Sequence, residues 1–463
     1  MSQELEDFRD SIGTINTDGS RNWLFPKRPV GKFYNWRTIV SVLYLTVFLI
    51  LPWLKYNGAP LFLFDIFNRK FILFGVIFWP QDFFLFVLGM LTFMVFIVLF
   101  TVVFGRIFCG WVCPQTIFME MVFRKIEYWI EGDGDAQKRL KNAEWSPEKL
   151  KKRVLKFSIF YVISFIIANY FLSYLIGMDN VVLYMKEGVF KHIATFIPLI
   201  LFTTIFFAVY TWFREQVCLI VCPYGRLQGV LLDRDSIVVA YDYVRGEPRG
   251  KFRKNDERTD GDCVDCHECV KVCPTGIDIR NGTQLECVNC TACIDACDAI
   301  MTKFNFDQGL IRYASENNIA KNEKLRFTSR IAAYTGVLSL LILVLSVLLI
   351  TRQDIDATVM RAKGTLYQEQ SNGSISNLYN IKLINKTRKN LPVVLKIQGE
   401  KKGVIRMVGN DLNVASESVG EGIFFVDIAQ DQLSGRKNKI EIGVYSYDKR
   451  VELVKTTFFA PNI

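Results

Sequence analysis

The chain has 463 residues, of which 51% are hydrophobic and 38 are phenylalanine, and 56 Lys and Arg against 46 Asp and Glu give a net charge of +10. This composition excludes an ordinary soluble enzyme. No motif supports nucleic-acid binding, and we expect the positive charge to face anionic membrane lipid instead.

Five uncharged stretches predict an α-helical membrane protein with five transmembrane helices. Each stretch is close to the roughly 20 residues that cross a bilayer core as a helix. Residues 38–213 are predicted to hold the first four helices and residues 330–350 the fifth. Residues 1–37 begin acidic and polar, without the pattern of a cleavable signal peptide. The stretches are 38–54, 83–104, 157–178, 193–213 and 331–350.

Lysine and arginine predict the orientation of these helices, because cytoplasmic loops carry an excess of both. The segment 106–156 carries eleven of them, whereas the segments 55–82 and 179–192 carry three and two. The loop 105–156 is therefore predicted to be cytoplasmic, as are the N-terminus and the segment 214–329. The tail is then predicted to lie on the opposite side of the membrane.

Two C-x-x-x-C-P motifs directly follow the second and fourth predicted helices. They contain Cys109 and Cys113 before Pro114, and Cys218 and Cys222 before Pro223. Proline favours the first position of a helix, so we predict helices over 114–131 and 223–232, with Cys113 and Cys222 at their N-caps. Because the motif recurs at equivalent places, we predict that the four thiols converge.

These four cysteines are candidates for a redox-active copper site. A thiolate at a helix N-cap is stabilised by the helix dipole, and we expect the nearby Arg106 and Arg214 to lower the thiol pKa further. Thiolate is a soft ligand that suits Cu(I) better than harder divalent ions. Two other interpretations stay open. The cysteines could be small apolar residues at helix ends, or they could form a disulfide relay, which a reducing cytoplasm disfavours.

The other eight cysteines repeat the C-x-x-C-x-x-C-x-x-x-C spacing of bacterial ferredoxins, in a domain expected at about residues 255–305. In two-cluster ferredoxins the fourth cysteine of each run binds the other cluster. One 4Fe-4S cluster is thus predicted to be held by Cys263, Cys266, Cys269 and Cys297. The second cluster is predicted to be held by Cys273, Cys287, Cys290 and Cys293.

Three other uses of these eight cysteines are less consistent with the spacing. Structural zinc favours C-x-x-C pairs but seldom needs the further cysteines of each run. Covalent haem is suggested by Cys263, Cys266 and His267, which spell C-x-x-C-H, but it leaves Cys269 and Cys273 unexplained. A disulfide framework belongs to small secreted chains.

The tail 351–463 contains short runs that alternate apolar and polar residues, at 379–383, 393–397 and 440–445. Such alternation is typical of strands with one buried face. We therefore predict a C-terminal all-β immunoglobulin-like sandwich with a docking role. The predicted fold is a five-helix membrane protein with an inserted two-cluster bacterial ferredoxin-like domain and this sandwich.

Three segments closely resemble the cytochrome c oxidase accessory protein family CcoG, also called FixG or RdxA. They read RIFCGWVCPQT at 106–116, REQVCLIVCPYGR at 214–226 and RGEPRG at 245–250. The resemblance implies a multi-pass protein of the bacterial inner (cytoplasmic) membrane with two 4Fe-4S clusters and a periplasmic tail. It also implies a role in assembling the cbb-type cytochrome c oxidase.

The family is regarded as a Cu(II) reductase, so the resemblance implies copper ions as substrate. Implied partners are a copper-exporting P-type ATPase, copper chaperones and cbb-type oxidase subunits, together with a cytoplasmic electron donor that no motif identifies. We expect Cu(II) to become Cu(I) at Cys109, Cys113, Cys218 and Cys222. Two alternatives stay open: a quinol-linked membrane ferredoxin that serves a periplasmic oxidoreductase, and an oxidase-assembly scaffold without enzymatic activity.

Overall fold

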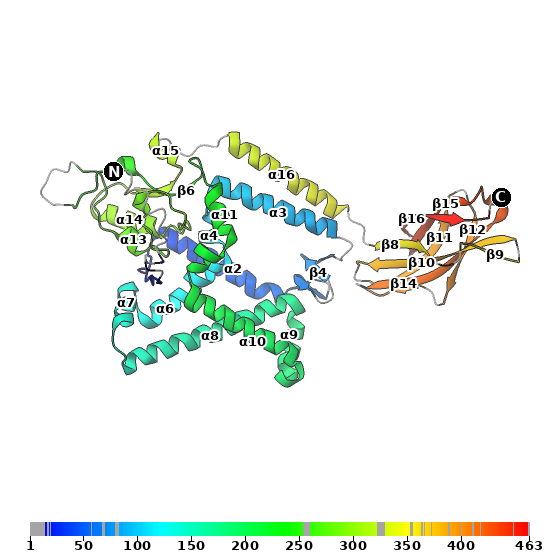
Figure 1. Cartoon of the computed structure of the whole chain (residues 1–463), viewed down its shortest axis with the longest axis horizontal. Helices are drawn as coiled ribbons and strands as arrows, with labels where there is room; N and C mark the ends of the chain where they lie inside the picture. The colour runs from blue at the N-terminus through cyan, green and yellow to red at the C-terminus, as the bar shows by residue number, and fades with distance from the viewer. Residues whose placement is uncertain are drawn as a thin grey trace. The chain divides into compact units, whose positions relative to one another are not determined.

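A computed structural model gives the architecture of the chain (Figure 1). It divides into two compact units, of which the first comprises Met1–Lys55, Pro60–Asn68 and Val87–Val344 and the second comprises Tyr56–Ala59, Arg69–Phe86 and Leu345–Ile463. The structure describes residues 14–15, 18, 20–56, 58–66, 70–78, 83–252, 260–321, 329–351, 355–362, 364, 366–371, 373–387, 389–399, 401–409, 412–416, 418–447 and 449–461.

The described residues contain five helices that are long and apolar enough to cross a membrane, as predicted. The third begins earlier than expected, at Pro147, because Ser146 caps it by accepting a 3.2 Å hydrogen bond from the Lys149 backbone N–H. Its first turns are charged, so a search for uncharged stretches misses them. The five are α2 with η1 (Lys32–Ile50, Leu51–Trp53), α3 (Phe83–Phe104), α8 (Pro147–Ile176), η4, α10 and η5 (Val189–His192, Ile193–Ala208, Val209–Phe213), and α16 (Ser329–Ile350).

The segment predicted as the loop 105–156 is largely helical. Pro114 begins a continuous helical stretch that ends at Glu131, as predicted, and it includes a π-helical turn, η3. The elements are α4 (Ile107–Trp111), α5 (Pro114–Thr116), η3 (Ile117–Phe123), α6 (Arg124–Glu131) and α7 (Gly134–Asn142). Further along the chain lie α9 (Met178–Glu187), η6 (Val217–Val221) and α11 (Pro223–Leu231).

The helix that follows the first cysteine pair is anchored by aromatic packing. The Phe123 ring in η3 stacks on Tyr210 of η5 with ring centroids 4.7 Å apart, and it meets Phe160 of α8 edge-on, also at 4.7 Å. Phe118 packs in the same core cluster. Aromatic pairs of this geometry add to the free energy gained by burial. The cluster fixes the first cysteine pair relative to α8 and α10.

The ferredoxin segment is framed by an antiparallel pair of strands, β6 (Val238–Tyr241) and β7 (Ile311–Ala314). Its helix α14 also caps α2, because the carboxylate of Asp295 accepts hydrogen bonds from the backbone N–H groups of Phe33 (3.0 Å) and Tyr34 (2.7 Å). The segment is therefore attached to the helices of the first unit. Its helices are α12 (Tyr243–Gly246), α13 (Glu268–Lys271), η7 (Ile279–Asn281), α14 (Ala292–Lys303) and α15 (Glu316–Ala320).

The C-terminal residues form two antiparallel sheets, which confirms the predicted sandwich. The sheet orders are β12-β14-β10-β8, with β9 on β10, and β13-β11-β15-β16. Alternate side chains of β8 and β11 are buried, and the core cluster also contains Tyr379, Phe424 and Ile442. The strands are β8 (Ile355–Arg361), β9 (Gln368–Glu369), β10 (Ser374–Asn385), β11 (Leu391–Gln398), β12 (Gly403–Val408), β13 (Leu412–Val414), β14 (Val419–Ala429), β15 (Lys437–Ser446) and β16 (Lys449–Phe459), with the turn η8 (Gln430–Gln432).

Five short strands lie between the first two long helices: β1 (Lys55–Tyr56), β2 (Ala59–Pro60), β3 (Leu63–Asp65), β4 (Lys70–Leu73) and β5 (Val76–Phe78). Strands β4 and β5 form an antiparallel hairpin in which Phe71 pairs with Phe78.

Candidate metal centres

The two C-x-x-x-C-P motifs have closely similar local structures. Cys109 lies in α4 and Cys218 in the π-helical turn η6, while Cys113 and Cys222 are the N-caps of the helices that begin at Pro114 and Pro223. This arrangement confirms the predicted helices, the second of which ends one residue earlier than expected. Each motif thus presents one thiol from a helical turn and one from the N-cap that follows.

Arg106 joins both motifs to the ferredoxin segment. Its Nε donates a 2.8 Å hydrogen bond to Oε1 of Gln228 in α11, and Nη2 donates a 2.9 Å bond to the carbonyl of Gly225. Its Nη1 donates to the backbone carbonyls of Leu285 and Cys287. The side chain is buried, so these bonds replace the water that a guanidinium needs. Sequence reasoning assigned Arg106 only an effect on thiol pKa and missed this role.

The four thiols lie close enough to influence one another's ionisation. Burial raises the pKa of Cys109 to about 11, and the charges of Cys113 and Cys222 act in the same direction. Burial likewise raises the pKa of Cys218 to about 12, with further contributions from Cys113, Cys109 and Cys222. The two motifs are therefore neighbours, as predicted, but their thiols do not form a closed metal site. Within the described residues, no three Cys, His, Asp or Glu side chains are close enough together to bind a single metal ion.

The expected effect of arginine on thiol pKa concerned the N-cap residues Cys113 and Cys222. At the other two thiols, Cys109 and Cys218, burial outweighs arginine. Arg106 does lower the pKa of Cys109, but burial outweighs it. Arg214 was expected to act on the second motif, yet its guanidinium forms two 2.9 Å hydrogen bonds with Glu127. In the absence of metal, Cys109 and Cys218 are therefore neutral thiols at neutral pH.

The first motif packs directly against the ferredoxin segment. Cys109 contacts the apolar cluster that contains Cys290, Val288 and Val272. Gly110 permits this approach, because a Cβ atom at this position would lie 2.5 Å from the carbonyl oxygen of Val288. This apolar contact, formed by Cys109, Val272, Val288 and Cys290, is the wall that the four-thiol region shares with the ferredoxin cysteines.

Replacing Gly110 with alanine is expected to push α4 away from the ferredoxin segment. The clash is with backbone atoms, so relief requires α4 to move, and we expect the free energy of unfolding to fall by about 2 kcal/mol. Denaturant unfolding in detergent measures the loss. Gly89→Ala in α3 is the matched control, since its Cβ would meet nothing within 4 Å. Equal stability of the two variants would show that the contact is not tight.

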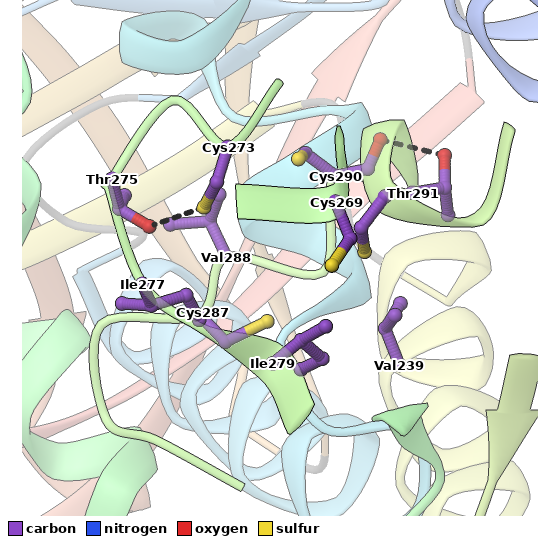
Figure 2. A pocket seen from close by; sticks show the side chains of 11 residues that line it. Val239, Cys269, Cys273, Thr275, Ile277, Ile279, Cys287, Val288, Cys290 and Thr291 are labelled. Carbon is purple, nitrogen blue, oxygen red and sulfur yellow. Dashed lines mark hydrogen bonds between the residues drawn. The ribbon is translucent and has the colours of Figure 1, made fainter. Parts of the chain in front are cut away.

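The eight ferredoxin cysteines line two cavities. Figure 2 shows the first, in which Cys273 of the first run lies with Cys287 and Cys290 of the second. Cys269 lies between the two cavities and lines both. The first cavity contains Cys269, Cys273, Cys287, Cys290 and Cys293, and the second contains Cys263, Cys266, Cys269 and Cys297.

These cavities fit 4Fe-4S clusters. Each offers the four cysteines of one predicted ligand set, including the one that crosses from the other run, and apolar residues such as Ile279 and Ile311 complete the walls. Burial raises the pKa of Cys287 to about 12 and that of Cys290 to about 11. Metal binding must therefore displace protons from these thiols. Cys266 is the exposed member of its set.

Comparisons with known proteins agree with this arrangement. The sequence matches a 4Fe-4S dicluster domain over residues 213–316 and an IG-like fold at the C-terminus of FixG, described as a putative oxidoreductase, over residues 345–461. It is 34% identical to Protein RdxB of Cereibacter sphaeroides over 434 residues, which cover 89% of this chain and 90% of that protein. The chain belongs to the FixG/RdxA family. The resemblance seen in the sequence is thereby confirmed.

A second relative of this FixG/RdxA-family chain is the nitrogen fixation protein FixG of Rhizobium meliloti. The two are 33% identical over 449 residues, which cover 87% of this chain and 83% of the relative. A solved FixG-related protein from Vibrio parahaemolyticus covers 23% of this chain with a TM-score of 0.20 and 19% identity. A 4Fe-4S binding domain also matches residues 86–132, which contain the first C-x-x-x-C-P motif. The chain is thus an iron-sulfur electron-transfer protein of the FixG/RdxA type.

Proposed function

We propose that this chain is a membrane-spanning iron-sulfur protein that reduces Cu(II) to Cu(I) and supplies cuprous ion for assembly of the cbb-type cytochrome c oxidase. The observation that carries the proposal is the shared wall between the four-thiol region and the ferredoxin cysteines, formed where Cys109 packs beside Cys290. Soft thiolate ligands placed directly beside an electron carrier suit a reaction that adds one electron to copper.

Extensive apolar exposure supports membrane insertion. In the described part of the long helices, Leu43, Ile197 and Leu343 are 60% to 65% exposed. The spacing of these helices and the distribution of lysine and arginine favour a cytoplasmic N-terminus and ferredoxin segment and a periplasmic tail, in the bacterial inner membrane.

The side chains take distinct roles in this proposal. Cys263, Cys266, Cys269 and Cys297 hold one cluster, and Cys273, Cys287, Cys290 and Cys293 hold the other. Each cluster supplies one electron at a time when bound. Cys109, Cys113, Cys218 and Cys222 bind the copper substrate.

The surroundings of the copper-binding thiols support the same roles. Arg106 places a buried positive charge beside Cys109, which offsets the negative charge that thiolates gain when they bind copper. The apolar wall shared with Val288 limits water at the contact.

Partners follow from the family and from the proposed substrate. A copper-exporting P-type ATPase and periplasmic copper chaperones would handle the cuprous ion, and subunits of the cbb-type oxidase would receive it. A cytoplasmic protein would provide electrons. Cys266 is exposed at the edge of its cavity, which is where a donor could approach most closely.

The four-thiol site is tested by the rate of anaerobic Cu(II) reduction, measured with a Cu(I)-specific chelator on cluster-loaded protein. Changing Cys109, Cys113, Cys218 and Cys222 together to serine is expected to lower the rate about tenfold or more with iron content unchanged, because serine does not bind Cu(I) strongly. The control changes Met90 and Met94, two other soft side chains, to leucine and should have no effect. Retention of the full rate in the quadruple variant would remove the thiols from the reaction.

A second candidate function is a quinol-linked membrane ferredoxin that passes electrons to a periplasmic oxidoreductase. The match of a 4Fe-4S binding domain to residues 86–132 favours it, because four thiolates also suit an iron-sulfur cluster. Iron content shows whether these thiols hold a further cluster: two clusters give about eight iron atoms per chain and three give about twelve. Reduction of the clusters by quinol in liposomes would further favour the alternative.

A further inference from the structure

A buried ion pair connects the segments that carry the two cysteine motifs. Glu127 lies in α6, within the helical stretch that follows Cys113, and Arg214 lies just before the second motif. Nη1 and Nη2 of Arg214 lie 2.9 Å from Oε1 and 2.9 Å from Oε2 of Glu127, in the parallel arrangement that gives the strongest hydrogen bonds between these groups. Both side chains are almost completely buried.

Arg214 adopts an unusual backbone conformation. Its φ is +53°, in the left-handed region that side chains other than glycine rarely occupy. It forms the corner between the π-helical turns η5 and η6, and its carbonyl accepts hydrogen bonds from Nε2 of Gln115 (3.4 Å) and from the Val217 N–H (3.3 Å). Such a conformation persists where surrounding contacts impose it. Gln115 and Glu127, which both follow the first motif, make two of those contacts.

Other charges surround the pair without replacing it. Nζ of Lys156 lies 3.5 Å from Glu127, and it lies closer, at 2.9 Å, to Glu131. Burial alone would raise the pKa of the Glu127 carboxyl, but Arg214, Lys156 and Arg124 hold it below its ordinary value. Glu127 is therefore a carboxylate at neutral pH, and Arg214 is its bidentate partner.

A buried ion pair often stabilises a fold no better than apolar side chains of similar size, because removing two charges from water is costly. Its directional hydrogen bonds can nevertheless select one geometry among several. Because this pair fixes the corner from which η6 and Cys218 extend, the geometry it selects is that of the second motif relative to the first.

We propose that Glu127 and Arg214 are positioning residues that hold the two cysteine motifs face to face. Neither contacts copper in this account. The proposal rests on one part of the proposed function, that the four thiols form a single site, and it does not depend on copper being the substrate.

The test measures the distance between the motifs with a short cross-linker, dibromobimane, on cluster-loaded full-length protein in detergent. Trypsin releases the first motif in peptide 107–124 and the second in peptide 215–226 of the natural chain, so mass spectrometry detects a link between them. The double variant Glu127→Gln with Arg214→Gln removes both charges of the pair, so neither is left buried without its partner. In this variant we expect the yield of the cross-link to fall about tenfold, a size typical of coupled buried residues.

Two further variants make the test specific. Arg214→Lys retains the charge but not the paired hydrogen bonds, and it should reduce the link about threefold if the paired geometry matters. Glu131→Gln is the matched control, because Glu131 is buried in the same helix and pairs with Lys156 and Arg153 but does not contact Arg214. It should leave the link unchanged.

The outcomes separate this proposal from the copper function. The positioning role would be overturned if Arg214→Lys and a double variant with full iron content both cross-link as well as the wild type. It would also be overturned if Glu131→Gln lost as much of the cross-link as these variants. If the double variant binds no iron, it has not folded, and the cross-link yield of Arg214→Lys alone then tests the positioning role. Absence of copper reduction in the wild type, with the expected cross-linking pattern, would overturn only the proposed substrate.

Discussion

Changing Cys290 to serine is expected to remove about half of the bound iron, because one of two clusters loses a ligand. The same substitution at Cys109 should leave the iron content unchanged. Cys290 belongs to an apolar cluster against which Cys109 packs, so the comparison separates a cluster ligand from a neighbouring thiol. Iron analysis and the visible absorbance of purified protein measure the effect.

The two cysteines that cross between the runs should each behave like Cys290 in the same assay. Cys297→Ser should affect the cluster whose other ligands include Cys263, and Cys273→Ser should affect the cluster bound by Cys287, since each lines the cavity of the opposite run. Loss of iron in Cys109→Ser equal to that in Cys290→Ser would contradict the account, because it would make Cys109 a cluster ligand.

Changing Arg106 to methionine is expected to lower the free energy of unfolding by about 3 kcal/mol, because buried polar partners lose their donor. Those partners are Gln228 and the carbonyls of Gly225, Leu285 and Cys287. They lie in α11, which follows the second motif, and in the ferredoxin segment, so the change should also weaken the contact between these two parts. Denaturant unfolding in detergent gives the magnitude.

Arg234→Met provides the control for this prediction, because Arg234 is 78% exposed and approaches Glu316 only at 3.9 Å. An exposed pair of this kind contributes less than about 1 kcal/mol. If Arg106→Met were as stable as Arg234→Met, this contact would not depend on the buried guanidinium.

Local rules were sufficient to predict much of the helical structure. The prolines after each cysteine motif predicted helices at Pro114 and Pro223, and both helices begin there. Uncharged length predicted the five long helices, and alternation predicted the strands of the sandwich. The start of α8 was missed although Ser146 and Pro147 form a recognisable cap, because its first turns are charged.

Features that depend on tertiary contacts could not be predicted in the same way. The cap that Asp295 provides to α2 joins residues far apart in the chain, and no local pattern indicates it. Burial also raises the pKa of Cys109 despite the nearby Arg106, and the sequence does not show the degree of burial. Arg214 was expected to lower the pKa of a nearby thiol, because the sequence does not show that its guanidinium pairs with Glu127.

The most direct test of copper reduction is a count of electrons without turnover. The clusters are first reduced under anaerobic conditions, excess reductant is removed, and Cu(II) is added with a Cu(I)-specific chelator. The account predicts about two Cu(I) ions per chain, one for each cluster, with return of the oxidised cluster absorbance. Clusters that stay reduced in the presence of Cu(II), with no Cu(I) formed, would contradict it.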